Sequence, residues 1–78
     1  MSKRESFTWN VTLWSANDEG IYRFVRDVRR QLPGRKFTKD TAEQIGYEIW
    51  PNGIPEMNGV RDMAKVAWGT VARDWNTL

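Results

Sequence analysis

The chain contains neither cysteine nor histidine among its 78 residues. Without cysteine, no disulfide can stabilise the fold. Because cysteine and histidine are the usual ligands of zinc, a zinc site is not expected either. The same absence removes the thiolate nucleophile and the most common general base of enzymes. We therefore expect no metal site, no cofactor and no enzymatic activity.

Three longer patterns are also missing. No apolar run approaches the ~20 residues that a membrane-spanning helix needs. Residues 1–5 are not followed by the apolar region of a secretory signal. The glycines stand singly, without the spacing of a phosphate-binding loop. We expect a cytoplasmic protein that does not contact a membrane.

A chain of this length forms one domain, here residues 1–78. A domain so small is only marginally stable unless something reinforces its core. With disulfides excluded, the large aromatic side chains are the remaining means, and five of them are tryptophans. They are Trp9, Trp14, Trp50, Trp68 and Trp75. We expect most of them in a tryptophan-rich core and one or two at an interface.

Hydrophobic periodicity indicates an all-α fold, a compact bundle of about four helices. A short first segment is followed by three longer helices, and the expected ranges are 8–15, 18–32, 39–50 and 59–76. The first segment fits helical spacing but also alternates weakly, so a strand is the alternative there.

Local residues set the expected helix ends. Asn17 or Asp18 can cap the second helix, Thr38 the third and Asn58 the fourth. Gly69 inside the fourth helix costs about 1 kcal/mol relative to alanine. A close approach of another helix or a tryptophan at this glycine would offset that cost.

Charge is weak overall but uneven along the chain. The net charge of +2 does not by itself predict a nucleic-acid partner. Residues 1–36 hold eight basic and four acidic residues, whereas residues 37–78 hold four basic and six acidic. The basic excess therefore lies in the first half.

Most of that excess is concentrated on and just after the second helix. The candidate partner-binding residues are Arg23, Arg26, Arg29, Arg30, Arg35 and Lys36. Arginine suits bidentate recognition of phosphate or carboxylate, so nucleic acid and an acidic protein surface are both possible partners. The alternative is a solvated helix face with internal ion pairs, such as Arg23 with Asp27, or Glu19 with Arg23 or Arg26.

A second candidate surface is the loop of residues 50–58, which is rich in proline and glycine. Ile54 and Met57 within it could anchor a protein contact. The alternative, which we favour, is that the loop folds these apolar side chains back over the core.

Residues 8–22 spell T-W-N-V-T-L-W-S-A-N-D-E-G-I-Y. The stretch resembles a group of small phage and mobile-element proteins that begin with T-W-N-V-x-L-W-x-x-N-D-E-x-x-Y. The resemblance implies a phage origin rather than a particular mechanism. Small phage proteins without catalytic residues often act as stoichiometric inhibitors or modifiers of host machines, among them CRISPR complexes, restriction enzymes and RNA polymerase.

Three functional hypotheses remain open. The first is a non-enzymatic phage-type accessory protein that binds a host protein or protein–nucleic-acid complex, for example to inhibit a defence system. The second is a small nucleic-acid-binding regulator that uses the same arginines. The third is a homo-oligomeric structural protein, with the small residues of the fourth helix at the contact. Monomer and homodimer are both compatible with the sequence.

Overall fold

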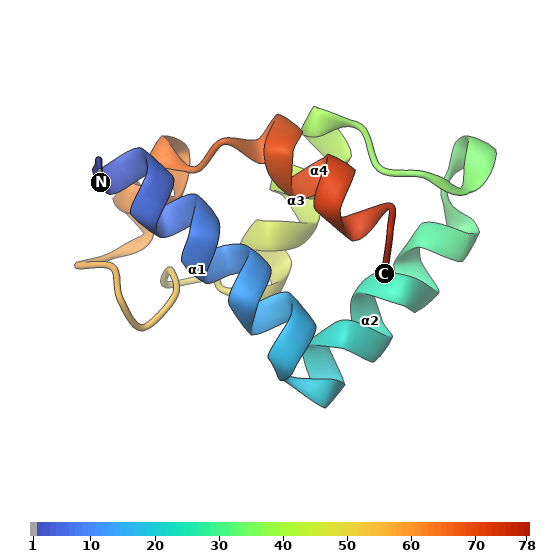
Figure 1. Cartoon of the computed structure of the whole chain (residues 1–78), viewed down its shortest axis with the longest axis horizontal. Coiled ribbons are helices and arrows are strands. Elements are labelled where there is room, and N and C mark those ends of the chain that lie inside the picture. The colour runs from blue at the N-terminus through green and yellow to red at the C-terminus, as the bar shows by residue number, and fades with distance from the viewer. Residues whose placement is uncertain (1) are drawn as a thin grey trace.

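A computed structural model describes residues 2–78, and every regular element in that range is a helix (Figure 1). This confirms the all-α prediction. The elements are α1 (Lys3–Asn17), α2 (Glu19–Gln31), the short 3-10 helix η1 (Pro33–Arg35), α3 (Lys39–Ile49), the 3-10 helix η2 (Val60–Lys65) and α4 (Trp68–Trp75). None of the described helices is long and apolar enough to cross a bilayer.

The first helix, α1, begins five residues before the predicted segment and is the longest helix of residues 2–78. Ser2 caps it, because its Oγ accepts from the Glu5 backbone N–H at 3.1 Å and donates to Glu5 Oε1 at 3.2 Å. The prediction of a short first segment is therefore wrong, and its strand alternative is excluded. The Ser2-to-Glu5 spacing is the sequence pattern of this cap.

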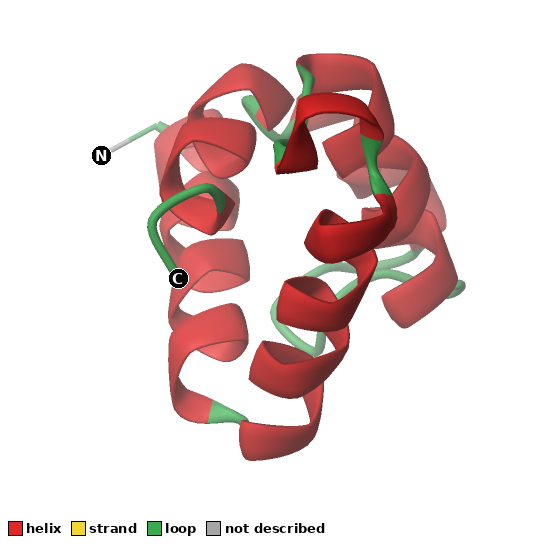
Figure 2. Ribbon diagram, turned by 90° about the vertical axis from the view of Figure 1, so that its right-hand side faces the viewer, coloured by secondary structure: helices red, strands yellow, loops and turns green. Residues whose placement is uncertain are grey.

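The turn between α1 and α2 consists of one residue, Asp18. Its backbone N–H donates to Trp14 O and ends α1, while its carboxylate accepts from Ile21 N at 3.0 Å and begins α2. Figure 2 shows the two helices meeting at this short loop like the arms of a V. The predicted cap and range of the second helix are confirmed to within a residue.

The third helix is also confirmed at its start. Thr38 accepts from the Thr41 backbone N–H at 3.2 Å, and Thr41 Oγ1 accepts from the Thr38 N–H at 2.8 Å. The helix ends at Ile49, with Trp50 as its C-cap and Pro51 next. A proline at this position cannot continue the helix.

The predicted fourth helix is divided into η2 and α4 by two non-helical residues, the extended Val66 and the N-cap Ala67. Val66 and Trp68 are two positions apart, so a continuous α-helix would direct them to different faces, yet both are buried. The break lets both side chains enter the core, and this packing overrides the local helical pattern.

The predicted cap of this segment, Asn58, is wrong. Its side chain does not cap η2, which Gly59 precedes without a side-chain cap. The Asn58 backbone N–H donates instead to Asp62 Oδ2 at 3.0 Å. This hydrogen bond is the main reason why the pKa of Asp62 is lowered, and the nearby Lys65 ammonium is the second.

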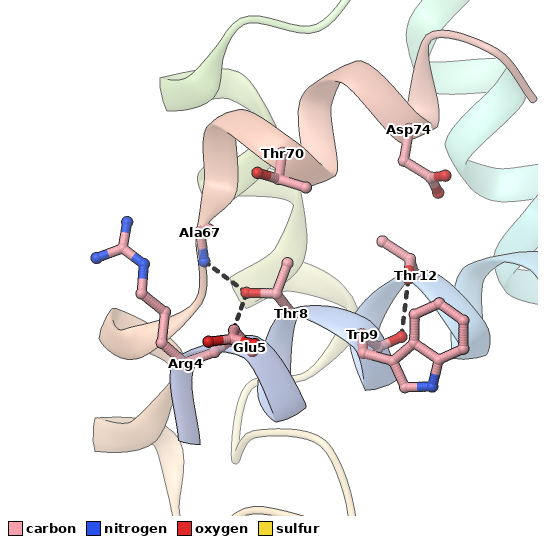
Figure 3. Close-up of a pocket in the computed structure, with 8 residues that line it drawn as sticks. All are labelled: Arg4, Glu5, Thr8, Trp9, Thr12, Ala67, Thr70 and Asp74. Atoms are coloured by element: carbon pink, nitrogen blue, oxygen red, sulfur yellow. Dashed lines mark hydrogen bonds between the residues drawn. The ribbon is translucent and has the colours of Figure 1, made fainter. Parts of the chain in front are cut away.

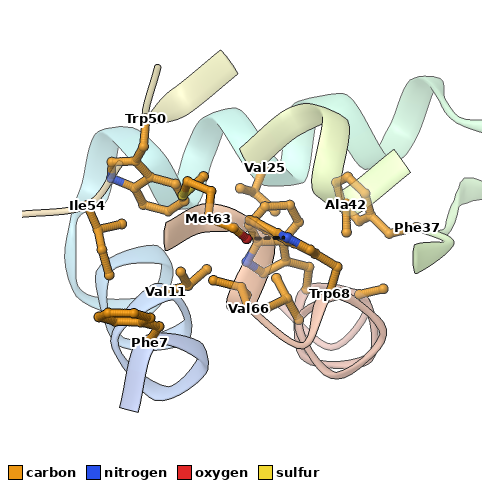
Figure 4. Close-up of a cluster of buried hydrophobic side chains, with 13 residues drawn as sticks. Phe7, Val11, Val25, Phe37, Ala42, Trp50, Ile54, Met63, Val66 and Trp68 are labelled. Carbon is orange, nitrogen blue, oxygen red and sulfur yellow. Dashed lines mark hydrogen bonds between the residues drawn. The ribbon is translucent and has the colours of Figure 1, made fainter. Parts of the chain in front are cut away.

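The core lies between the helices and is rich in tryptophan, as predicted (Figure 4). Trp50, Trp68 and Trp75 are buried, whereas Trp14 is half-buried and Trp9 is exposed. The buried apolar side chains are Phe7, Val11, Val25, Phe37, Ala42, Trp50, Ile54, Met63, Val66, Trp68, Val71, Ala72 and Trp75.

Two hydroxyl groups on one face of α1 bind the C-terminal part of the chain. Thr8 Oγ1 accepts from the Ala67 backbone N–H at 2.9 Å, and Ser15 Oγ accepts from Trp75 Nε1 at 2.9 Å. Because these hydroxyls are seven residues apart, they lie two turns apart on the same side of α1. They hold the two ends of α4 beside α1 and so define the space between the two helices.

Candidate partner-binding surfaces

Three of the predicted arginines gather on the face of α2 that points away from the core. Arg23, Arg26 and Arg30 line a shallow hollow of about 170 Å³, together with Asp27. We call these three residues the arginine surface. Val25 is buried, and Ile21 and Val28 pack against the core. The core therefore holds one side of α2 and leaves the arginine surface on the other.

Two members of the arginine surface form exposed ion pairs. Arg23 Nη2 pairs with Glu19 Oε1, as the sequence suggested. Asp27 pairs with Arg30 at 3.5 Å rather than with Arg23, so that part of the expectation is wrong. Exposed pairs contribute little, about 0–1 kcal/mol, because water and salt screen them. A partner that offers better anion geometry could replace them at small cost.

The third member, Arg26, is held differently. Its guanidinium carbon lies 5.6 Å from the centre of the Tyr22 ring, within the range of a cation–π contact. Its Nε is buried and has no hydrogen-bond partner within residues 2–78. Because this N–H is buried, it is an unsatisfied donor beneath the surface, and a partner's anion would meet the end of the guanidinium instead.

The remaining predicted cations do not belong to this surface. Arg29 Nη1 donates to the backbone oxygen of Trp75 at 2.8 Å, so Arg29 joins α2 to the end of α4 and has a structural role. The sequence pattern placed Arg29 among the partner-binding residues, whereas the structure shows one of its Nη groups engaged with α4 and not at the hollow. Arg35 and Lys36 are exposed beyond the end of α2 but do not line the hollow.

The loop of residues 50–58 buries Ile54 and leaves Met57 half-buried against the core, which is the alternative that the sequence favoured. Ile54 is only 1% exposed, and Met57 packs against the core. Glu56, between them, accepts from Trp14 Nε1 at 2.8 Å and so binds the loop to α1. The loop buries its apolar residues because they complete the core beside Phe7 and Trp50 (Figure 4).

A surface that the sequence did not reveal lies between α1 and α4. It is a groove of about 490 Å³, and Figure 3 shows its lining. The lining residues are Arg4, Glu5, Thr8, Trp9, Thr12, Ala67, Thr70 and Asp74. Trp9 is 57% exposed, the most exposed large apolar side chain of residues 2–78. We call this feature the α1–α4 groove.

Charged residues lie at opposite ends of the α1–α4 groove. Arg4 and Glu5 are at one end, and Asp74 is at the other, on α4 across from Thr12 and Trp9 on α1 (Figure 3). Asp74 is half-buried, and this burial raises the pKa of its carboxyl group. No ion pair or side-chain hydrogen bond within residues 2–78 reaches this carboxylate.

Replacing Asp74 with asparagine is expected to stabilise the protein at neutral pH. Because burial raises the folded-state pKa, the ionised carboxylate opposes folding. This penalty is present at neutral pH, shrinks as the pH falls through the raised pKa, and is gone below the unfolded value of about 3.9. Urea unfolding of both proteins at pH 7 and pH 3 measures the difference.

The control removes one carboxylate from an exposed site, by Glu48→Gln. A gain for Asp74→Asn that persists unchanged at pH 3 would show that the carboxylate charge is not its cause, and a loss at pH 7 would show that Asp74 has a stabilising partner.

Comparison with known proteins gives no match: no family model, no curated protein and no solved structure matches this chain. A functional assignment therefore depends on the arginine surface and the α1–α4 groove themselves. Among the described residues, no group of three or more acidic, histidine or cysteine side chains is placed to hold a metal ion. The groups that both surfaces display are suited to recognising charged and aromatic partners.

Proposed function

We propose that this chain is a non-enzymatic, phage-type accessory protein that binds a host protein complex through the arginine surface. The resemblance of residues 8–22 to small phage proteins supports the origin, and inhibition of a host defence system is the corresponding role. The observation that carries the proposal is the position of Arg23, Arg26 and Arg30. They gather on the side of α2 opposite the buried Val25, where Arg23 and Arg30 are exposed and Arg26 is half-buried.

The chemistry of the arginine surface favours a protein partner over nucleic acid. Glu19 and Asp27 lie among the arginines and already accept from them. Carboxylates in this position would repel a phosphate backbone, whereas a protein surface carries charges of both signs. Phe24, on the same helix, is 40% exposed and offers an apolar contact. Aromatic residues and arginine are the types enriched at protein interfaces.

The expected energetics follow from how arginine binds carboxylates. A guanidinium can donate two parallel hydrogen bonds to one carboxylate, which fixes orientation as well as strength. Interface arginines are often among the few residues whose loss costs about 2 kcal/mol or more of binding free energy. Reversing two such charges turns attraction into repulsion, so we expect binding to fall at least about a hundredfold.

The test is the double variant Arg26→Glu/Arg30→Glu, used as bait in a bacterial lysate beside the wild type. The matched control is Lys39→Glu/Arg61→Glu, which makes the same charge change at two exposed positions away from the arginine surface. We expect the control to retain the captured complex and the arginine variant to lose it, with both melting temperatures close to the wild-type value. Retention by the arginine variant would place the interface elsewhere.

A further inference from the structure

We propose that the α1–α4 groove is a second binding site, which takes a lysine or arginine side chain of a protein partner between Trp9 and Asp74. Both residues line the groove, and in Figure 3 they lie near the same end of it. An aromatic face and a carboxylate are the two groups that together bind an organic cation most effectively. This site shares no residue with the arginine surface.

Asp74 supplies the charge for this recognition. Its carboxylate has lost part of its hydration through burial and gains no ion pair from residues 2–78 in return. The cation lining the same groove, Arg4, lies at the far end (Figure 3). A half-buried and unpaired carboxylate attracts a cation more strongly than an exposed one, because the local dielectric screening is weaker.

The walls of the groove suit the aliphatic part of a lysine or arginine side chain. The hydroxyls of the three lining threonines are engaged locally: Thr8 with Arg4 O and Ala67 N, Thr12 with Trp9 O, and Thr70 with the Arg73 guanidinium. Their methyl groups and Ala67 therefore remain as apolar lining. Long basic side chains bury their methylene stems against such surfaces while the charged end finds a polar partner.

Other occupants fit the α1–α4 groove less well. A nucleotide could stack on Trp9, but its phosphate would meet two carboxylates, Glu5 and Asp74, with Arg4 as the single cation of the lining. A neutral apolar ligand would leave the Asp74 carboxylate partly desolvated and still unpaired. The charges of the groove therefore favour a basic side chain over these alternatives. The partner polypeptide that carries this side chain would lie along α1 and α4.

The experiment is an NMR titration of the wild-type protein with N-acetyl-arginine methylamide and N-acetyl-lysine methylamide. The norleucine analogue has the stem without the charge, and the glutamate analogue has the opposite charge. We expect saturable shifts of the Trp9 indole N–H and of the Thr12 and Asp74 amides. A small probe should bind with a dissociation constant on the order of 1 mM. The norleucine and glutamate analogues should bind at least about tenfold more weakly.

Two variants and one control make the titration decisive. Asp74→Asn and Trp9→Ala should each abolish the saturable shifts, whereas Glu48→Gln should bind as the wild type does. The absence of shifts, equal shifts with the norleucine analogue, or unchanged binding by Asp74→Asn would each overturn the proposal. Shifts that depend on protein concentration without a probe would assign the groove to a second copy of the chain and overturn it too. None of these results bears on the arginine surface.

Discussion

Replacing Gly46 with alanine is expected to lower the free energy of unfolding by about 2–3 kcal/mol, because the new methyl group would overlap a buried ring. A Cβ at this position of α3 would lie 2.5 Å from Trp68 Cζ3 and closer still to Cη2. The Trp68 ring cannot swing away freely. Its Nε1 donates to Met63 O at 3.0 Å, and the Trp75 ring packs 6.4 Å away. Urea denaturation followed by circular dichroism measures the loss.

Gly69→Ala is the matched control for this substitution. A Cβ there meets no atom within 4 Å, so alanine should be neutral or stabilise α4 by about 0.5–1 kcal/mol. The sequence pointed to Gly69 as the position of close approach, and the structure shows that it is Gly46. In a Trp68→Phe background, which lacks the overlapping atoms, Gly46→Ala should cost much less. An equal cost in both backgrounds would contradict the steric explanation.

Trp75→Ala is expected to be the most damaging substitution in the chain, with a loss of about 3–5 kcal/mol. A domain of this size has only about 4–12 kcal/mol in total, so the variant should be partly or wholly unfolded at 37 °C. Trp75 is fully buried and connects four segments. Its ring packs on Phe37 at 5.0 Å, its Nε1 donates to Ser15, and its carbonyl oxygen accepts from Arg29. Thermal unfolding by calorimetry provides the measurement.

Trp9→Ala is the corresponding control, since it removes the same side chain from an exposed position. Its effect on the free energy of unfolding should stay within about 0.5 kcal/mol. If both substitutions destabilise the protein equally, then Trp9 is packed in solution. The exposed groove wall described above would then not exist.

The parts of the fold that the sequence could predict depend on interactions between near neighbours. The caps at Asp18 and Thr38 are formed with residues three positions away, and the helices that follow them begin within a residue of the expected position. The Ser2 cap of α1 follows the same rule and was available in the sequence. The periodicity of α1 does not indicate its first turns, because its apolar residues do not form a single periodic face.

The parts that could not be predicted depend on contacts between distant segments. The break at Val66 arises because the Val66 and Trp68 side chains both pack in the core. The local helical pattern does not indicate this requirement. It also separates the small residues of the predicted fourth helix, since Ala64 is exposed and Ala72 is buried. They therefore do not form the continuous contact face expected for a homo-oligomer.

The candidate sites differ in the same way: one depends on near neighbours in the sequence and the other on distant segments. The arginine surface lies on one helix, so the spacing of Arg23, Arg26 and Arg30 was sufficient to predict it. Arg29 could not be separated from them, because its partner is a carbonyl oxygen 46 positions away in the chain. The α1–α4 groove joins residues from both ends of the chain. No local pattern marks it, because only the structure shows that Thr8 is buried while the neighbouring Trp9 is exposed.

The most direct test of the central claim is to repeat the capture from bacterial lysate with and without nuclease, using the wild type and Arg26→Glu/Arg30→Glu, and to identify the bound proteins by mass spectrometry. The account predicts a discrete protein complex that survives nuclease treatment and is lost with the arginine variant. A complex that disappears on nuclease treatment would contradict it and would identify the chain as a nucleic-acid-binding protein.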